Sequence, residues 1–569
     1  MRKKSGKNAG ICLVILIIMT AGLWTGCGGG GAAPADTSAA GTSAAADGGA
    51  PAAEAAGGSG EKIIRMTQAG GYFIDPGVGV DYASMILCVN LYDSLVYPDL
   101  DGTLKAGAAE EGWEVSEDGL TWNFTLRPGI KFHDGTEMKA SDVTFSVNRM
   151  LTMGEGFAYL FADYVDKVEA IGDYGVQFIL GRPFAPFLRI LPRIYILNEA
   201  VVRENQAEGP YGVFGDYGKA YLAEHDAGSG AYYCEAMLVQ DRVIMKRFDG
   251  YFGEFEPNAP DTVEIITGTE PAAVRALMSS GQLEISDQWQ PNEAYDALDG
   301  IEGVSVGSMA TGQILFLMLN TAKAPTDDVH VRRAISHLID YDQVINVLFP
   351  GYLEADSPVL AGLPGHAEGL SPYEFSLDKA REELALSAYA DQLDSIAVEV
   401  VWISEVPDEE KLALLIQANA QQIGLKVNVT RVPWSAHVNN VAAMETTPNA
   451  APCYMGPDYD EGGATLYQRF HSDTSATWQQ IEWLRSDAMD AQIDSALVTV
   501  DQDARFAIYA DIQREVMDGV YGISVAESAE KHAYCDFVKW PAMERANRGE
   551  NMASGLGYNY QFRTFEVNK

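Results

Sequence analysis

The segment that decides the fold reads "GWEVSEDGLTWNFTLRPGIKFHDGTEMKASDVTFSVNRM" and covers residues 112–150. Its first part carries the turn signal Asp118-Gly119 between two arms rich in Trp, Val, Thr and Phe, which is typical of a β-hairpin. Apolar residues alternate with polar ones along the second arm, at Leu120, Trp122, Phe124 and Leu126. Because alternate residues of a strand point to opposite faces, this pattern predicts a hairpin that buries one face.

A turn and a helix are expected after this hairpin. Pro128 and Gly129 predict a tight turn, because proline presets its φ and glycine tolerates left-handed backbone. A helix should begin near Ser141 or Asp142, since an apolar stripe with helical spacing follows. Its members are Val143, Val147, Met150 and Leu151.

Strand-like and helix-like patterns alternate along the rest of the chain. The predicted strands are 61–67, 176–180, 314–320 and 425–432, and the predicted helices are 81–96 and 408–423. A Gly-rich break at 226–233 indicates a crossing between domains. Such alternation implies mixed sheets covered by helices, which is an α/β fold.

The N-terminus has the features of an export signal. Residues 1–26 start with basic side chains and continue with an apolar run at 11–24, shorter than the roughly 20 residues that span a bilayer. Thr25 and Gly26 precede Cys27, as at a bacterial lipoprotein processing site, where the cysteine thiol is lipidated. The alternative is an ordinary secretory signal followed by an incidental cysteine.

Residues 27–60 are predicted to be the lipidated Cys27 and a disordered tether. The segment is rich in Ala, Gly and Ser and has no periodic apolar face. A flexible chain of this length spans about 30 Å. We therefore expect a protein anchored in the cell membrane by lipid, with its folded part on the extracytoplasmic face.

Charge and motifs exclude several classes of function. The net charge is -41, with 80 acidic against 39 basic residues, which disfavours nucleic acid as a partner. No HExxH, GxxxxGK[ST] or GxSxG pattern occurs, so we expect no catalytic residue, no metal and no cofactor. The four cysteines after residue 27 are too widely spaced for the sequence to decide whether they form disulfides; they are Cys88, Cys234, Cys453 and Cys535.

Several blocks together resemble one family, the extracytoplasmic solute-binding proteins of ABC transporters in the oligopeptide, dipeptide and nickel group. The blocks are 91–102, 112–150, 228–237, 319–340 and 417–429, and the resemblance spans roughly 61–540. Two positions depart from the family pattern. Lys139 stands where the family prefers a capping Thr, and 247–252 replaces an Asn-containing consensus.

The resemblance implies a two-lobed, periplasmic-binding-protein-like fold of type II, with an extra α+β domain beside lobe I. The expected boundaries are 1–26 for the signal, 27–60 for the tether, 61–98 with 229–308 and 530–569 for lobe I, 99–228 for the extra domain and 309–529 for lobe II. Ligand is expected between the lobes. Closure of the lobes would then report its presence to the permease.

The resemblance also implies where ligand is held. In peptide-binding members an acidic side chain grips the α-ammonium of the ligand, and Asp458 with Tyr459 stand at the matching positions. Trp434 and Trp289 are candidates for the pocket wall, because aromatic side chains supply rigid apolar area. The alternatives are a solvated acidic turn at 456–463 and ordinary core or edge tryptophans.

His133 and Asp134 invite interpretation as a catalytic pair, but the resemblance argues for a structural role. They lie in the turn after the hairpin block of the extra domain. We expect Asp134 and Gly135 to serve the turn geometry, and His133 to pack or hydrogen-bond locally.

The resulting hypothesis is a monomeric solute-binding lipoprotein, not an enzyme, which captures a short peptide and delivers it to an ABC permease. An oligosaccharide is the alternative ligand, since 27 Tyr and 9 Trp are available to stack on sugar faces. A nickel chelate, another small polar solute and a sensor that binds a signal peptide without transport stay open. A more remote alternative is an extracellular hydrolase that uses a pair of acidic residues.

Overall fold

The computed structural model describes residues 60–68, 72–79, 81–238, 240–268, 270–370, 373–404, 406–550 and 557–569. The predicted signal, Cys27 and the tether up to residue 59 lie outside this part of the chain. None of the helices in the described part combines the length and the hydrophobicity that crossing a membrane requires. Cys88, Cys234, Cys453 and Cys535 are free thiols, so the question that the sequence left open is answered against disulfides.

The predicted hairpin is present and forms part of a four-stranded antiparallel sheet. Its strands, in spatial order, are β4 (Glu114–Val115), β5 (Thr121–Thr125), β7 (Gly175–Leu180) and β6 (Val165–Ile171). Val115 lies opposite Trp122 across the turn. Trp122, Phe124 and Leu126 are buried and Leu120 is half-buried, so the alternation identified the core-facing side of this arm.

The predicted helix follows as α2 (Ala140–Met153). Lys139 occupies the position before the helix, where its side chain does not cap. Asp142 compensates, because its carboxylate accepts the backbone N–H of Lys139 at 2.8 Å. The departure from the family pattern at Lys139 therefore leaves the start of this helix intact.

A second sheet joins the first strand of the folded body to strands much later in the chain. Its order is β1 (Ile63–Gln68), β10 (Thr262–Thr267), β9 (Arg242–Arg247) and β8 (Tyr232–Leu238). β1 and β10 run parallel, whereas the other pairs are antiparallel. The helix predicted from residue 81 is α1 (Tyr82–Leu91), which packs against β8 and begins after the capping residue Asp81.

The third large sheet has the order β13 (Val427–Val432), β12 (Val398–Ile403), β14 (Ala450–Met455), β11 (Val304–Leu319) and β15 (Gly522–Cys535). β12 runs parallel to β13 and to β14. The other main helices are α7 (Pro271–Ser279), α8 (Asn292–Asp299), α9 (Val329–Ser336), α11 (Leu377–Leu386), α12 (Pro407–Gln422), α13 (Trp434–Val441), α14 (Gly462–Phe470), α15 (Asp487–Val498) and α16 (Gln502–Gly519). α12 confirms the helix predicted at 408–423 and covers this sheet.

Residues 314–319, the last part of β11, are buried on both faces, which explains the continuous apolar run there. Leu315, Leu317 and Leu319 belong to one hydrophobic core, whereas Phe316 and Met318 belong to the other. Successive residues of a strand alternate between faces, and a strand with two buried faces needs apolar residues at every position.

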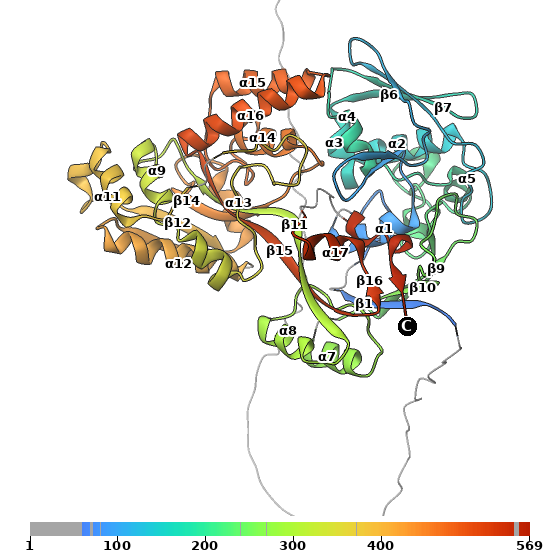
Figure 1. Ribbon diagram of the computed structural model, residues 1–569. Coiled ribbons are helices and arrows are strands. Elements are labelled where there is room, and N and C mark those ends of the chain that lie inside the picture. Colours follow the sequence, from blue (N-terminus) through green and yellow to red (C-terminus); the bar gives the residue numbers. More distant parts are fainter. Residues whose placement is uncertain are drawn as a thin grey trace, which may run out of the picture. The chain divides into compact units, whose positions relative to one another are not determined.

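β11 and β15 connect the second sheet to the third, as Figure 1 shows for the two long strands lying side by side. They pair from Val304 opposite Cys535 to Met318 opposite Gly522. At the lower end, Ile285 bridges Met66 of β1 and Tyr534 of β15. The pairing register shifts after Ala310, and an interrupted ladder of this kind is a point at which two strands bend.

Candidate functional site

Two predicted site residues follow parallel strands at one edge of the third sheet. Trp434 comes directly after β13, and Asp458 comes after β14. The two strands flank β12 and run in the same direction, so their carboxyl ends meet at one edge about 10 Å apart. In open α/β sheets this edge is where ligands bind.

The carboxylate of Asp458 is half-buried and has only neutral hydrogen-bond partners. The hydroxyl of Tyr159, in the short helix α3 (Tyr159–Ala162), donates to Asp458 Oδ1 at 3.3 Å. The side chain of Gln468 on α14 is its other hydrogen-bond partner. Among the described residues, no Lys, Arg or His nitrogen lies within the 4.0 Å ion-pair distance of this carboxylate.

Burial raises the pKa of Asp458, and the neutral hydrogen bonds together with the more distant charge of Arg193 oppose that rise. The carboxylate therefore lacks a counter-charge in a poorly solvated position. Tyr159 was missed by the sequence analysis, because no periodic pattern or turn signal marks it. It lies 299 residues before its partner, so only the folded chain brings the two together.

The loop after Asp458 is not a solvated acidic turn, which corrects that alternative. Asp460 and Glu461 are 5% and 0% exposed. Glu461 receives two hydrogen bonds from Arg505, at 2.9 and 3.0 Å, and one from the Tyr509 hydroxyl at 2.9 Å. These contacts hold the loop that carries Asp458 against α16.

The side chain of Tyr459 is buried against Phe184. Its ring meets that of Phe184 edge-on, with centroids 5.8 Å apart, and it is only 7% exposed. Burial raises its pKa well above the ordinary value. The structure thus separates the two neighbours, with Asp458 among polar partners and Tyr459 in the core.

Trp434 lies in an aromatic cluster at the sheet edge. Its ring meets Trp478 edge-on at 5.3 Å and stacks on His437 at 5.9 Å. Burial lowers the pKa of His437 to about 4, so this imidazole is neutral at physiological pH. Trp434 is 38% exposed, which leaves part of the indole accessible to a ligand.

Trp289 lies close in sequence to Ile285, which bridges strands of the second and third sheets. The backbone N–H of Trp289 donates to the buried carboxylate of Asp287 at 2.8 Å. Asp287 also accepts from Thr67 of β1 at 2.9 Å. At 62% exposure Trp289 is the more accessible of the two predicted tryptophans.

His133 has a structural role, and Asp134 is not one of its hydrogen-bond partners. Its ring nitrogens bond Asp226 at 2.5 Å and the carbonyl of Gly230 at 3.0 Å, and its ring packs on Phe248. The packing on Phe248 agrees with the expected structural role, while the hydrogen-bond partners lie 93 and 97 residues further along the chain. Asp134 serves the turn by accepting from the Thr136 N–H at 2.8 Å.

Known proteins of similar sequence point to one family. Residues 103–477 match the model of the middle part of the bacterial extracellular solute-binding proteins, family 5. The probable D,D-dipeptide-binding periplasmic protein of Escherichia coli K12 is 27% identical over 454 residues, which cover 78% of this chain and 84% of that protein.

Two solved structures have the same fold. The ABC transporter-associated periplasmic binding protein DppA of Helicobacter pylori, in complex with the peptide STSA, aligns with a TM-score of 0.68 at 23% identity, over 90% of this chain and 99% of that one. A Campylobacter jejuni protein in complex with Ni(L-His) aligns with a TM-score of 0.69 at 17% identity, over 89% and 100%. Both likenesses support a two-lobed periplasmic-binding-protein fold of type II.

Proposed function

This chain belongs to the bacterial extracellular solute-binding proteins of family 5, and on that premise we propose that it captures short peptides for an ABC permease. Asp458 binds the α-ammonium of the peptide, and Trp434 and Trp289 contribute wall surface from two different lobes. The protein releases its ligand unchanged, so it needs no catalytic group and no cofactor. The E. coli relative named for D,D-dipeptide binding supports a peptide as ligand.

One observation carries the peptide assignment, namely the missing counter-charge of Asp458. Its carboxylate accepts from Tyr159 and Gln468, which are neutral, while burial raises its pKa. An ammonium group would supply the missing positive charge and form a charge-assisted hydrogen bond. Arg505 is unavailable for this role, because Glu461 already neutralises it.

Closure of the lobes strengthens this contact. The loop of Asp458 and the helix of Tyr159 are already in contact, so bending at the register shift in β11 and β15 would close the second sheet, with Trp289, over this pair and the ligand. Exclusion of water lowers the local dielectric constant, and a charge pair is then stronger than in solvent. Ligand therefore shifts the population toward the closed form that a permease would recognise.

A calorimetric titration with matched peptide pairs tests the assignment. The folded body, refolded from urea to remove co-purified ligand, is titrated with di-, tri- and tetrapeptides and with their N-acetylated forms. We expect binding of free peptides and a loss of about tenfold or more on acetylation, because acetylation removes the charge that Asp458 would bind. If no peptide binds and another class of solute does, the peptide assignment is wrong.

An oligosaccharide is the second candidate, because Trp434 and Trp289 are both partly accessible. Sugar rings stack on such indole faces. Reciprocal variants separate the two ligands: loss of binding in Asp458→Ala with Trp434→Ala neutral indicates a peptide, and the reverse indicates a sugar. Metal analysis after equilibrium dialysis would identify a nickel chelate.

We further propose that Cys27 is lipidated and anchors the protein on the extracytoplasmic face of the cell membrane, as a monomer. The basic and apolar character of residues 1–26 and the small residues before Cys27 support this. Cys27→Ala should abolish incorporation of labelled palmitate and release the protein from the membrane fraction. Absence of label in the wild-type protein would instead indicate an ordinary secretory signal, and unchanged labelling of Cys27→Ala would place the lipid at another residue.

A further inference from the structure

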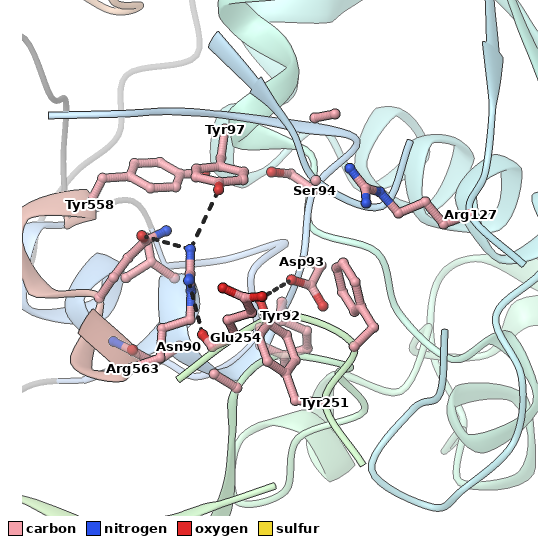
Figure 2. A pocket seen from close by; sticks show the side chains of 17 residues that line it. Asn90, Tyr92, Asp93, Ser94, Tyr97, Arg127, Tyr251, Glu254, Tyr558 and Arg563 are labelled. Atoms are coloured by element: carbon pink, nitrogen blue, oxygen red, sulfur yellow. Dashed lines mark hydrogen bonds between the residues drawn. The ribbon is translucent and has the colours of Figure 1, made fainter. Parts of the chain in front are cut away.

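A cavity of about 420 Å³ lies in the lobe that contains β8, far along the chain from Asp458 (Figure 2). Its walls come from the segment after α1, from the loop at 251–254, from Arg127 and from the C-terminal segment at 558–563. The volume falls within the range of about 300 to 1,000 Å³ that is usual for small-molecule sites. The peptide proposal makes no use of this cavity.

Arg563 provides a positive charge without a negative partner on one side of the cavity. Its guanidinium donates to the carbonyl of Glu254 at 3.2 Å, to the Tyr97 hydroxyl at 3.5 Å and to Gln561 at 3.4 Å, and all three acceptors are neutral. In the described part of the chain, no carboxylate comes within the 4.0 Å ion-pair distance of Arg563. The guanidinium is thereby oriented by neutral groups but not neutralised.

Asp93 provides the opposite charge on another wall. Its carboxylate accepts from the Ser229 hydroxyl at 2.8 Å and from the Tyr251 hydroxyl at 3.3 Å. Burial raises its pKa to about 6, and Ser229 and the charge of Arg563 oppose the rise. No described Lys, Arg or His nitrogen is within 4.0 Å of this carboxylate either.

Figure 2 shows Arg563 and Asp93 on two sides of one space, each held by a tyrosine hydroxyl, Tyr97 for the arginine and Tyr251 for the aspartate. The two charges interact electrostatically but do not form an ion pair. A cavity that separates two half-buried, oppositely charged and oriented groups is complementary to a molecule with both charges.

We propose that this cavity is a second binding site, for a free α-amino acid or a similarly small zwitterion. The ligand carboxylate binds Arg563 and its ammonium binds Asp93, while Tyr97 and Tyr558, whose rings stack with centroids 6.5 Å apart, contribute apolar surface. The site does not depend on the proposed peptide function, because none of its lining residues contacts Asp458.

Binding of free amino acids to the refolded, full mature protein tests the proposal. The probes are a panel of free α-amino acids, each with its N-acetylated and its methyl-ester form, measured by calorimetry. We expect at least one free amino acid to bind, and each blocked form to bind at least about tenfold more weakly. The proposal is overturned if no free amino acid binds, or if both blocked forms bind equally well.

Variants and a crystal structure locate the bound amino acid. Arg563→Gln and Asp93→Asn should each weaken its binding at least about tenfold, whereas Asp458→Asn should leave it unchanged. The opposite pattern would assign the amino acid to the peptide site and overturn the proposal. Should either variant fail to fold, a crystal of the wild-type protein with the bound amino acid decides: density between Arg563 and Asp93 supports the site, and density only beside Asp458 refutes it.

Discussion

The turn around His133 and the loop around Asp458 differ in whether the protein satisfies its own polar groups. Each ring nitrogen of His133 has a partner, in Asp226 and Gly230. Asp458, by contrast, has two neutral partners and, among the described residues, no cation within ion-pair distance. A group whose partners all lie within the chain stabilises the fold, whereas a partly buried charge without a counter-ion is available to a ligand.

The same contrast recurs within three residues of one loop. Glu461 is fully buried and is matched by Arg505 and Tyr509, so it fixes the loop. Asp458 stands at the accessible end of the same loop. The structure thus places the two acids of one short segment in different environments, which the composition of the segment does not distinguish.

The largest effect is expected from Glu461→Gln. This change leaves the Arg505 guanidinium buried without a counter-charge, and breaking a buried pair in this way costs about 3 to 5 kcal/mol of unfolding free energy. Urea denaturation measures it, with Asp391→Asn, at an exposed carboxylate, as the matched control. Unchanged stability together with lost peptide affinity would place Glu461 with the ligand-binding group instead.

Asp458→Asn should act on binding rather than on stability. We expect peptide affinity to fall by about 2 kcal/mol, roughly 30-fold in Kd, because a charge-assisted hydrogen bond becomes a neutral one. Stability should stay the same or rise slightly, since the variant no longer buries an unpaired carboxylate. If the Asp458→Asn variant is much less stable and binds peptides normally, Asp458 has a structural role like that of His133.

His133→Ala should show the reverse pattern. Loss of two hydrogen bonds and of the packing on Phe248 is expected to lower stability by about 1 to 2 kcal/mol. Peptide affinity should stay within a few-fold of the wild type. His225→Ala, at an exposed histidine, is the control, and a large affinity loss in a well-folded His133 variant would contradict the structural role.

The smallest expected effect is the pH dependence of the His133 contribution. Burial disfavours the charged ring, yet the hydrogen bond and charge of Asp226 outweigh it, and the pKa of His133 rises above the ordinary 6.5. Because the folded pKa is the higher one, the stabilisation is fully present below pH 6.5 and is lost as the pH rises through the folded pKa. The stability difference between wild type and His133→Ala should therefore shrink from about pH 5 to about pH 9, and a growing difference would exclude this pairing.

Local patterns in the sequence were sufficient to predict most of the secondary structure at residues 112–150. The alternation at Trp122 and Phe124 located the buried face of β5, because a strand repeats every two residues whatever its surroundings. The start of α2 also follows from local chemistry, in which Asp142 bonds the backbone of Lys139. Local patterns did not predict the candidate site. Asp458 was selected from the family resemblance, and no feature of the sequence near Tyr159 marks it.

The sequence alone determined that this chain forms mixed sheets covered by helices and that its hairpin block identifies the family, because periodicity and turn chemistry act between near neighbours. Only the tertiary structure decided which charges stay unpaired. Asp226 reaches His133 across 93 residues, and Tyr159 reaches Asp458 across 299. Arg563 and Asp93 face one cavity from opposite parts of the chain. Such pairings depend on how the lobes and the extra domain pack, and no local pattern records the partner that a buried charge will find or lack.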